Sequence, residues 1–236
     1  MTGKLYLIPS PLGSDALHSI PPYVIEHLQG LNYIIAERGK TTRAFMKATE
    51  PVKPFSDITF FELNKRTERA ELPTFLKPLE QGHDVGLLSE AGCPGVADPG
   101  ALLVDLAHKK NIEVVPLVGP SSILLALMAS GMNGQSFCFH GYLPQKKPAI
   151  GKSLQKLEMM AFRHRQSQIF IETPYRNNPL MQEALKALKD TTKLCVATDL
   201  TLPSQKVVTK TIGEWKKSEL PDLHKRPSVF IVGGGS

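Results

Sequence analysis

The sequence lacks the features of several protein classes. Its three cysteines, Cys93, Cys138 and Cys195, include no C-x₂-C pair, and their odd number argues against a disulfide framework. We therefore expect neither disulfides nor a bound metal. No apolar run approaches the roughly 18 residues of a membrane span, and the first residues lack the pattern of a signal peptide. The expectation is a cytoplasmic protein that does not enter a membrane.

Glycine motifs that bind phosphate are also missing. No G-x-G-x-x-G occurs in the chain. Gly39-Lys40-Thr41 follows an apolar run, but Ile34 stands where a phosphate-binding loop needs its first glycine. The sequence therefore argues against a nucleoside triphosphatase.

The overall composition is that of a globular protein. The 236 residues are 42% hydrophobic and 21% charged, which is ordinary for a folded domain. The formal net charge is +6, which favours an anionic partner such as RNA. A moderately basic enzyme without such a partner would have the same charge, so both interpretations stay open.

The first half of the chain alternates short apolar runs with helical patterns. Continuous apolar runs indicate strands that are buried on both faces of a sheet. Strands alternating with helices predict a parallel sheet with right-handed crossovers. Asp98 and Pro99 have the residue types that begin a helix. The expected strands are residues 5–8, 33–36, 58–61, 85–88 and 114–117, and the expected helices include residues 68–81 and 121–130.

The second half has a different order of elements. Its last three expected strands follow one another with little helix between them, which predicts a mixed sheet. The basic stretch at residues 145–152 is expected to form a loop. The chain should thus be an α/β protein with two α/β domains, residues 1–118 and 119–236, the first with a parallel five-stranded sheet. The expected strands of the second domain are residues 137–140, 168–172, 194–198, 206–211 and 229–232.

A loop rich in glycine and proline follows the expected strand at residues 85–88. In open parallel sheets, ligands bind beyond the carboxyl ends of the strands. Segments 9–13, 90–100 and 118–122 all lie at such ends. Glycine allows the backbone to approach a ligand, and proline holds a loop rigid. A helix start explains Asp98 and Pro99 but leaves residues 90–95 unexplained, so these are interpreted as a binding loop.

Five segments together resemble the tetrapyrrole methylase superfamily. They are LYLIPSPLG, LLSEAGCPGVADPG, VPLVGPSSILLALMASG, FHGYLPQKK and IFIETPYR, in that order along the chain. The pattern is most similar to the branch of small-subunit ribosomal RNA ribose 2′-O-methyltransferases. The resemblance implies two α/β domains, S-adenosylmethionine in the cleft between them, and a homodimer. The first domain would lie on the substrate side, and both domains would line the cleft.

The resemblance also implies the residues that contact the cofactor. S-adenosylmethionine carries no phosphate, so the absence of a phosphate-binding motif is consistent with it. Ser121 and Ser122 have an alternative role as helix caps, and Ile123 has one as a core residue. The implied cofactor residues are Pro9, Glu90, Ala91, Gly92, Cys93, Pro94, Val96, Ser121, Ser122, Ile123, Tyr142, Leu143, Glu172 and Pro174.

The chain departs from the ribosomal RNA branch on the expected substrate side. Arg38 follows Ala36-Glu37 where that branch usually has an acidic residue, and Phe61 stands where it has a histidine. Thr198-Asp199-Leu200 replaces an Arg-Glu-Leu segment. The cofactor loop shows no such departure, so the resemblance supports the cofactor better than the substrate.

Methyl transfer to a ribose hydroxyl needs an aligned acceptor and a group that takes the proton. Glu37 and Glu62 are the candidate catalytic bases, because each follows an expected strand at its carboxyl end. Their alternative is a surface ion pair with Arg38, Arg43 or Lys65, worth about 0–1 kcal/mol.

Basic residues are the candidates for binding the RNA backbone. They are Arg43, Lys146, Lys147 and Arg176, although a solvated loop explains the lysines equally well. The sequence thus predicts an S-adenosylmethionine-dependent methyltransferase, most simply one acting on a ribose of ribosomal RNA. The alternatives are a methyltransferase for a tetrapyrrole or another small molecule, and an inactive binding protein of the same fold.

Overall fold

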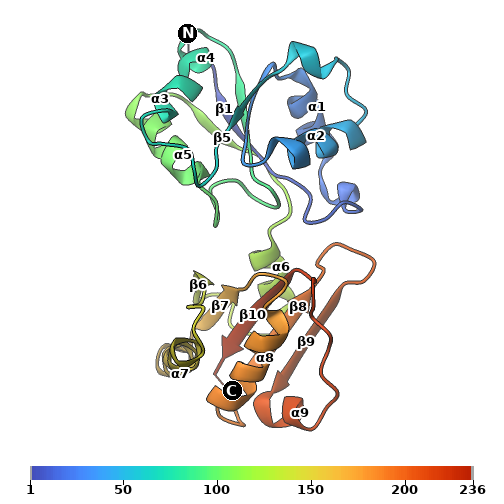
Figure 1. Cartoon of the computed structure of the whole chain (residues 1–236), viewed down its shortest axis with the longest axis vertical. Coiled ribbons are helices and arrows are strands. Elements are labelled where there is room, and N and C mark those ends of the chain that lie inside the picture. Colours follow the sequence, from blue (N-terminus) through green and yellow to red (C-terminus); the bar gives the residue numbers. More distant parts are fainter. Residues whose placement is uncertain (1, 235–236) are drawn as a thin grey trace. The chain divides into compact units, whose positions relative to one another are not determined.

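A computed structural model describes residues 2–234, except for the side chain of Lys147. The chain forms two compact units, Met1–Ser121 and Ser122–Ser236 (Figure 1). The sequence placed the boundary after residue 118, within the segment that leads into the second unit.

The first unit contains a five-stranded, all-parallel sheet in the order β3-β2-β4-β1-β5. The expected strands are all present, with ends shifted by a residue in two of them. The strands are β1 (Leu5–Ile8), β2 (Tyr33–Ala36), β3 (Thr59–Glu62), β4 (Val85–Leu88) and β5 (Val114–Pro116). The helices are α1 (Pro22–Gly30), α2 (Gly39–Ala48), α3 (Leu72–Phe75), α4 (Lys77–Glu80) and α5 (Gly100–Lys109).

The continuous apolar strands have a hydrophobic core on each face of this sheet. Ile35 and Leu87 pack with buried residues of α3, α4 and α5. Ile34 and Leu88, one position along, pack with buried residues of α1 and α2. Alternation along the strands therefore fills both cores, as expected for a doubly covered parallel sheet.

The expected helix at residues 68–81 is two short helices. Pro73 and Pro78 each lie in the first turn of one of them. Proline is tolerated there because the first backbone amides of a helix have no partner within it. The prolines therefore begin α3 and α4 in succession.

The second unit contains a mixed sheet in the order β6-β7-β10-β8-β9. The β6–β7 pair is parallel and the other pairs are antiparallel, which confirms the expected mixed sheet. The strands are β6 (Phe137–Tyr142), β7 (Ser167–Ile171), β8 (Lys193–Thr198), β9 (Lys206–Thr211) and β10 (Ser228–Gly233). The helices are α6 (Ser122–Ser130), α7 (Lys147–His164), α8 (Asn177–Ala187) and α9 (Ile212–Lys216).

The prediction of a loop at residues 145–152 was wrong. Helix α7 begins at Lys147, with Pro148 in its first turn. Ile150, Leu154 and Leu157 are buried at helical spacing against the core of the second unit. The apolar stripe therefore extends the helix into the lysine-rich segment, where Lys146 and Lys152 are exposed.

The main core of the second unit lies between its sheet and helices α7, α8 and α9. Phe170 of β7 and Phe230 of β10 stack there with ring centroids 5.6 Å apart. Residues one position along, such as Ile169 and Ile231, point to the opposite face of the sheet, and helix α6 contacts the strands β8, β9 and β10. No helix within residues 2–234 is long and apolar enough to cross a membrane.

Candidate functional site

Three loops of the first unit follow the carboxyl ends of β1, β4 and β5. The loops after β1 and β4 are joined by a bridge between Ser10 and Gly92. The backbone amide of each donates to the carbonyl of the other, both at 2.9 Å. Backbone pairing between the β1 and β4 segments thus continues for one bridge beyond the end of the sheet.

Buried serine hydroxyls reinforce this bridge. Oγ of Ser10 donates to the carbonyl of Ser89 at 2.9 Å, and Oγ of Ser89 lies 3.0 Å from the carbonyl of Gly92. Both serines are at most 4% exposed. Because buried hydroxyls are costly unless hydrogen-bonded, this arrangement fixes the loop after β4. Neither serine was identified as a site residue from the sequence.

The third loop packs closely against the other two. A Cβ added to Gly119 would lie 2.2 Å from Cγ of Pro9, so only glycine allows this approach. Sγ of Cys93 lies 3.5 Å from the carbonyl of Pro120. Burial raises the pKa of the Cys93 thiol, so the group remains protonated at neutral pH. The packing of Pro9 on Gly119 therefore holds the loops after β1 and β5 together, and the Cys93 thiol adds a weak contact to the loop after β5.

Asp98 fastens the far end of the binding loop. Its Oδ1 accepts a hydrogen bond from the Gly100 amide at 2.7 Å, and both of its carboxylate oxygens lie within 3.0 Å of the Gly95 amide. Asp98 was expected to cap α5, but the N-cap is Pro99 and has no side-chain capping hydrogen bond. Asp98 lies one residue earlier and binds the amide of Gly100, the first residue of the helix. Burial is the main cause that raises the pKa of Asp98, and the two backbone amides oppose it.

The loop so fixed exposes small residues and backbone. Ala91 and Val96 are exposed, whereas Gly92 and Pro94 are buried. Gly92 and Gly95 have φ values of 77° and 81°, a left-handed conformation that glycine adopts at low cost. The loop is therefore held by hydrogen bonds at Gly92 and Gly95 and is accessible at Ala91 and Val96.

Glu37 lies beside this loop, directly after β2. Its Oε2 accepts a hydrogen bond from the backbone amide of Glu90 at 3.0 Å. Burial raises the pKa of Glu37, the Glu90 amide lowers it, and the negative charges of Asp98 and Glu90 add to the increase. A raised carboxyl pKa suits a group that takes a proton near neutral pH.

Arg38, which follows Glu37 after β2, forms an ion pair with Glu90 in the loop after β4. Nη1 of Arg38 lies 3.3 Å from Oε1 of Glu90, and the Thr41 hydroxyl lies 3.5 Å from the same oxygen. Both charged side chains are about half exposed or more, so this pair contributes about 0–1 kcal/mol. The arginine that departs from the ribosomal RNA pattern is therefore in direct contact with the binding loop.

Glu62 and Arg43 make separate contacts. Glu62, the last residue of β3, accepts a hydrogen bond from Nδ2 of Asn64 at 2.9 Å. The Arg43 guanidinium lies 4.5 Å from the centroid of the Phe60 ring, a cation–π contact. Within residues 2–234, no ion pair joins Glu37 or Glu62 to a basic side chain.

In the second unit, Glu172 and Arg176 form a pair after β7. Oε1 of Glu172 lies 2.5 Å from Nη2 of Arg176 and accepts from the Thr173 amide at 2.6 Å. The Glu172 side chain is 2% exposed and that of Arg176 is 33% exposed. The geometry supports a structural role for the Glu172 carboxylate and leaves one face of Arg176 accessible.

The remaining residues expected in the second unit lie in varied surroundings. Leu143 belongs to the hydrophobic core, whereas Tyr142 is exposed. The Pro174 carbonyl accepts from the Lys225 amide at 3.0 Å. Ser122 and Ile123 begin α6 and are half-buried, and Ser121 precedes it. Lys146 is exposed before α7, and the side chain of Lys147 lies outside the described part of the chain.

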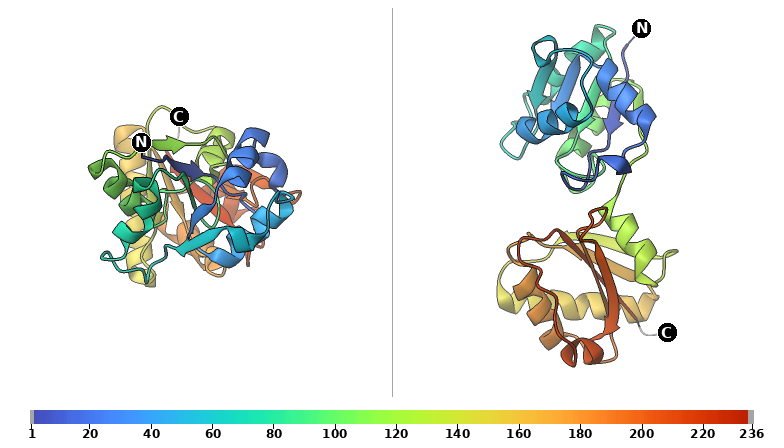
Figure 2. Two further views of the ribbon diagram at one scale, coloured as in Figure 1. Left: turned by 90° about the horizontal axis from the view of Figure 1, so that it is seen from above. Right: turned by 90° about the vertical axis from the view of Figure 1, so that its right-hand side faces the viewer.

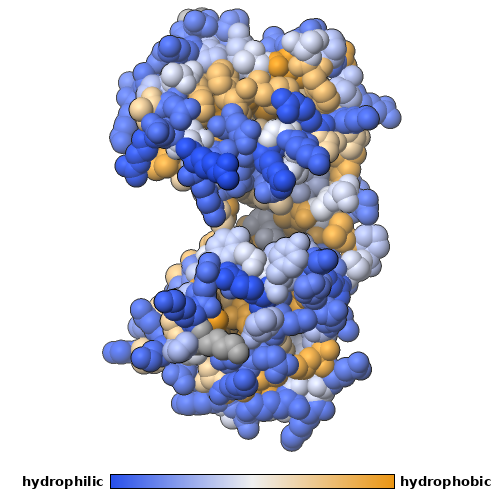
Figure 3. All heavy atoms as spheres, viewed as in Figure 1, coloured by the Kyte–Doolittle hydropathy of each residue, from blue (hydrophilic) through white to orange (hydrophobic). Residues whose placement is uncertain are grey.

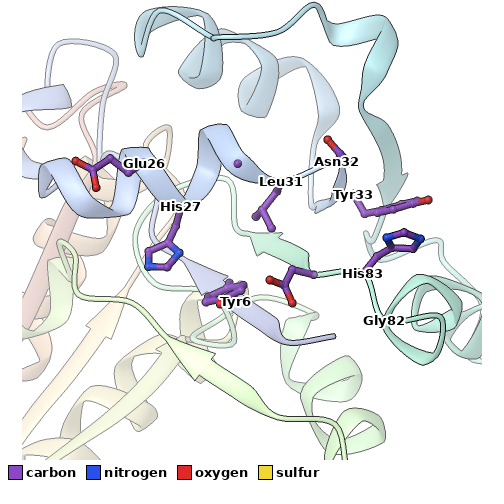
Figure 4. Close-up of a pocket in the computed structure, with 10 residues that line it drawn as sticks. Tyr6, Glu26, His27, Leu31, Asn32, Tyr33, Gly82 and His83 are labelled. Carbon is purple, nitrogen blue, oxygen red and sulfur yellow. The ribbon is translucent and has the colours of Figure 1, made fainter. Parts of the chain in front are cut away.

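A second hollow lies at the opposite end of the first sheet (Figure 4). It has a volume of about 460 Å³. Tyr6 contacts His27 and Tyr33 contacts His83 in its wall, each as a pair of tilted rings. The hollow adjoins the amino ends of the strands, whereas parallel sheets bind ligands at the carboxyl ends. The loops around Gly92 are therefore the candidate functional site. Within residues 2–234, no three His, Cys, Asp or Glu side chains are grouped to hold a metal ion.

The two α/β units and the fixed loop beyond the parallel sheet match a known class of methyltransferases. Residues 4–216 match the model of the tetrapyrrole (corrin/porphyrin) methylases. The chain belongs to this family.

The chain is similar in sequence to ribosomal RNA methyltransferases and in structure to a tetrapyrrole-family methyltransferase. "Ribosomal RNA small subunit methyltransferase I" of Escherichia coli O157:H7 is 29% identical over 98% of this chain and 78% of its own length. The protein of the same name from Haemophilus influenzae is 30% identical over 99% and 80%, respectively. Among solved structures, the methyltransferase CobJ has a TM-score of 0.64 at 19% identity, covering 99% of this chain and 95% of its own. The structural similarity to CobJ confirms the predicted fold of two α/β domains.

Proposed function

We propose that this protein is an S-adenosylmethionine-dependent methyltransferase that methylates a ribose 2′-hydroxyl of small-subunit ribosomal RNA. The observation that carries this proposal is the identity of 29–30% to proteins named ribosomal RNA small subunit methyltransferase I, over nearly the whole chain. This similarity implies a cytoplasmic enzyme, and the family resemblance implies a homodimer that binds S-adenosylmethionine.

The residues of the binding loop fit S-adenosylmethionine. The molecule has a positive sulfonium and no phosphate, so it needs backbone contacts and nearby carboxylates rather than a cluster of cations. Ala91 and Val96 are exposed on this loop, and Glu37 and Glu90 supply carboxylates beside it. The cofactor contacts in the second unit, including Ile123, Tyr142 and Pro174, belong to the same proposal.

The reaction requires few protein groups. When bound, the cofactor supplies an electrophilic methyl group that is transferred by in-line displacement. The fixed loops around Gly92 hold the binding surface in one geometry, which favours alignment. Glu37 accepts the proton of the attacking hydroxyl, because burial raises the pKa of its carboxyl. Glu62, bound to Asn64, then helps to position the acceptor.

Four basic residues have the role of positioning RNA. Arg43 and Arg176 each keep part of the guanidinium accessible beside its partner. Lys146 and Lys147 lie at the start of α7. Contacts of this kind to phosphate fix the orientation of RNA but do not select its sequence.

The first experiment is calorimetric titration with S-adenosylmethionine, using ATP as the control ligand. We expect micromolar binding of the former and none of the latter. Transfer of a labelled methyl group is then measured to small ribosomal subunits and to a tetrapyrrole, for wild type and Glu37→Gln. Label in the subunits supports the proposal, and label in the tetrapyrrole instead replaces it with the small-molecule alternative. Binding without transfer to either would indicate a protein that has lost catalysis.

A further inference from the structure

Helix α7 has a row of cations on its solvent side. Lys152, Lys156 and Arg163 are all exposed, and their spacing places them along one face of the helix. Their side chains form no ion pair within residues 2–234. Figure 1 shows α7 end-on, and the right-hand view of Figure 2 shows its length; it packs against α8 and the strands β7 and β10.

Two further cations, Arg165 and Lys189, line hollows at the end of this row. Lys189 lines a hollow of about 730 Å³ together with Arg163, and Arg165 lines another of about 530 Å³. Phe162 lines both hollows and is 43% exposed, and Met159 lines the first and is 56% exposed. We call this surface the α7 basic face. It comprises Lys152, Lys156, Met159, Phe162, Arg163, Arg165 and Lys189.

Acidic groups near this face are already bound. Glu158 lines the first hollow, but its carboxylate is buried and accepts hydrogen bonds from the Lys189 amide and the Thr192 hydroxyl. Asp190 pairs with Lys216 at 2.6 Å. Lys193 lines the second hollow and is close enough to Glu214 to lower the pKa of that carboxyl, so it is not counted in the face. The face therefore retains a net positive charge.

We propose that the α7 basic face binds single-stranded or looped RNA, apart from the loops that hold the reacting groups. This proposal rests on the proposed function, because it concerns how the RNA substrate is held. A base stacks on Phe162, and the flanking phosphates contact Arg163 with Lys189 on one side and Arg165 on the other. Unpaired cations next to an exposed aromatic ring form the combination that binds unpaired nucleotides.

The surroundings favour RNA over a lipid surface. The apolar side of α7 is committed to the protein core through Leu154, Leu157 and Ala161. Only Met159 and Phe162 on the face itself are apolar, which is too little for a helix to lie in a membrane interface. On the side that Figure 3 shows, the second unit is mainly hydrophilic, with small separate hydrophobic patches.

The test is fluorescence anisotropy with a labelled, mixed-sequence single-stranded RNA at several salt concentrations. The test variant combines Lys156→Gln, Arg163→Gln, Arg165→Asn and Lys189→Gln. Asparagine is chosen because residue 165 has a φ of 49°, which asparagine tolerates. We expect at least tenfold weaker binding and a salt dependence reduced by up to about 3 in logarithmic slope, about 0.7 for each lost phosphate contact.

The aromatic contact is tested separately. Phe162→Ala should weaken RNA binding about tenfold, whereas Phe162→Tyr should retain it, because tyrosine keeps a ring on which a base stacks. A merely structural role would make both variants unstable without this difference, so thermal melting is recorded for each. Equal RNA affinity of wild type and Phe162→Ala would overturn the stacking contact.

The control for charge is Lys47→Gln combined with Lys217→Gln, two exposed lysines outside the face. It should bind RNA about as tightly as wild type, because neither lysine belongs to the face. Wild-type RNA affinity in the test variant overturns the proposal. Binding of wild type to anionic phosphatidylserine vesicles but not to RNA would also overturn it. The same holds if Phe162→Asp loses self-association but keeps RNA binding.

Calorimetry with S-adenosylmethionine separates this proposal from the proposed function. The test variant should bind the cofactor like wild type and show a raised KM for RNA with an unchanged kcat. If wild type methylates ribosomal subunits but the variant has the same KM, RNA binding by the α7 basic face is rejected and the proposed function is retained. If RNA binds to the α7 basic face but neither cofactor binding nor methyl transfer occurs, the proposed function is rejected and RNA binding by the face is retained.

Discussion

The Glu37 carboxylate accepts a hydrogen bond from the Glu90 amide, with 3.0 Å between the two atoms. This bond joins the end of β2 to the loop after β4, and the partly buried carboxyl has a raised pKa. The same burial that makes Glu37 a better base makes its ionised form costly to the fold.

Glu37→Gln is therefore expected to separate activity from stability. The amide oxygen of the substituted side chain can still accept from the Glu90 amide, but it cannot take a proton. We expect methyl transfer to fall by about 10²–10⁴, and the wild-type rise in rate with pH, as the carboxylate forms, to disappear. Single-turnover rates across pH measure both effects.

Stability has the opposite pH dependence. Because the folded pKa of Glu37 is raised, its stabilising contribution is complete below the ordinary value of about 4.3 and is lost as pH rises through the folded pKa. Wild type should therefore lose stability relative to Glu37→Gln as pH rises from the ordinary carboxyl pKa through the raised pKa of the folded protein. Urea unfolding of both proteins at several pH values measures this difference. A constant difference would contradict the raised pKa.

Asp98→Ala should loosen the binding loop without unfolding the sheet. The substitution removes acceptors for the Gly95 and Gly100 amides, at an expected cost of about 1–2 kcal/mol. We expect weaker binding of S-adenosylmethionine by calorimetry and a lower urea midpoint. Asp98→Asn keeps an acceptor oxygen and should lie between wild type and Asp98→Ala. Equal affinities for all three proteins would show that the loop does not contact the cofactor.

Most of the fold could be predicted from sequence because buried parallel strands are continuous apolar runs. Residues 85–88, for example, are buried throughout, and both strand and position were predicted. The α7 segment was predicted wrongly because lysines and Pro148 resemble a loop, while the buried Ile150 reveals a helix only through its spacing to Leu154 and Leu157. Local composition and long-range packing conflicted there, and packing prevailed.

The binding loop could be recognised from its glycines and prolines, but its network could not. The bridge from Ser10 to Gly92 joins segments far apart in the chain, and a serine hydroxyl gives no sequence signal of its buried partner. Glu172 is the reverse case, because its motif suggested a cofactor contact while its carboxylate is bound to Arg176 and Thr173. Side-chain pairing of this kind depends on three-dimensional contacts.

Cys93 should contribute little through its thiol. Its pKa is raised by burial, and its thiol makes one hydrogen bond, to the Pro120 carbonyl at 3.5 Å, for which a thiol is a weak donor. Cys93→Ala should change the dissociation constant for S-adenosylmethionine by less than about tenfold, or about 1.4 kcal/mol. Reaction with iodoacetamide at neutral pH should also be slow, because the thiolate is the reactive form. A larger loss of affinity would assign the side chain a direct contact.

Gly119→Ala is expected to be the most damaging small substitution in the site. The new methyl group would lie 2.2 Å from Cγ and 2.3 Å from Cβ of Pro9, and a proline ring cannot rotate away. The backbone must move, at a cost of about 1–3 kcal/mol, and separation of the two loops should weaken cofactor binding more than tenfold.

Gly30→Ala is the matched control for this prediction. It lies in the same unit, at the end of α1, and an added Cβ would meet nothing within 4 Å. It should leave cofactor affinity unchanged and keep or slightly raise stability, because alanine favours a helix more than glycine by up to about 1 kcal/mol. Unfolding by urea and calorimetric titration of both variants provide the comparison. If both variants behaved alike, the close packing of Gly119 on Pro9 would have no part in forming the site.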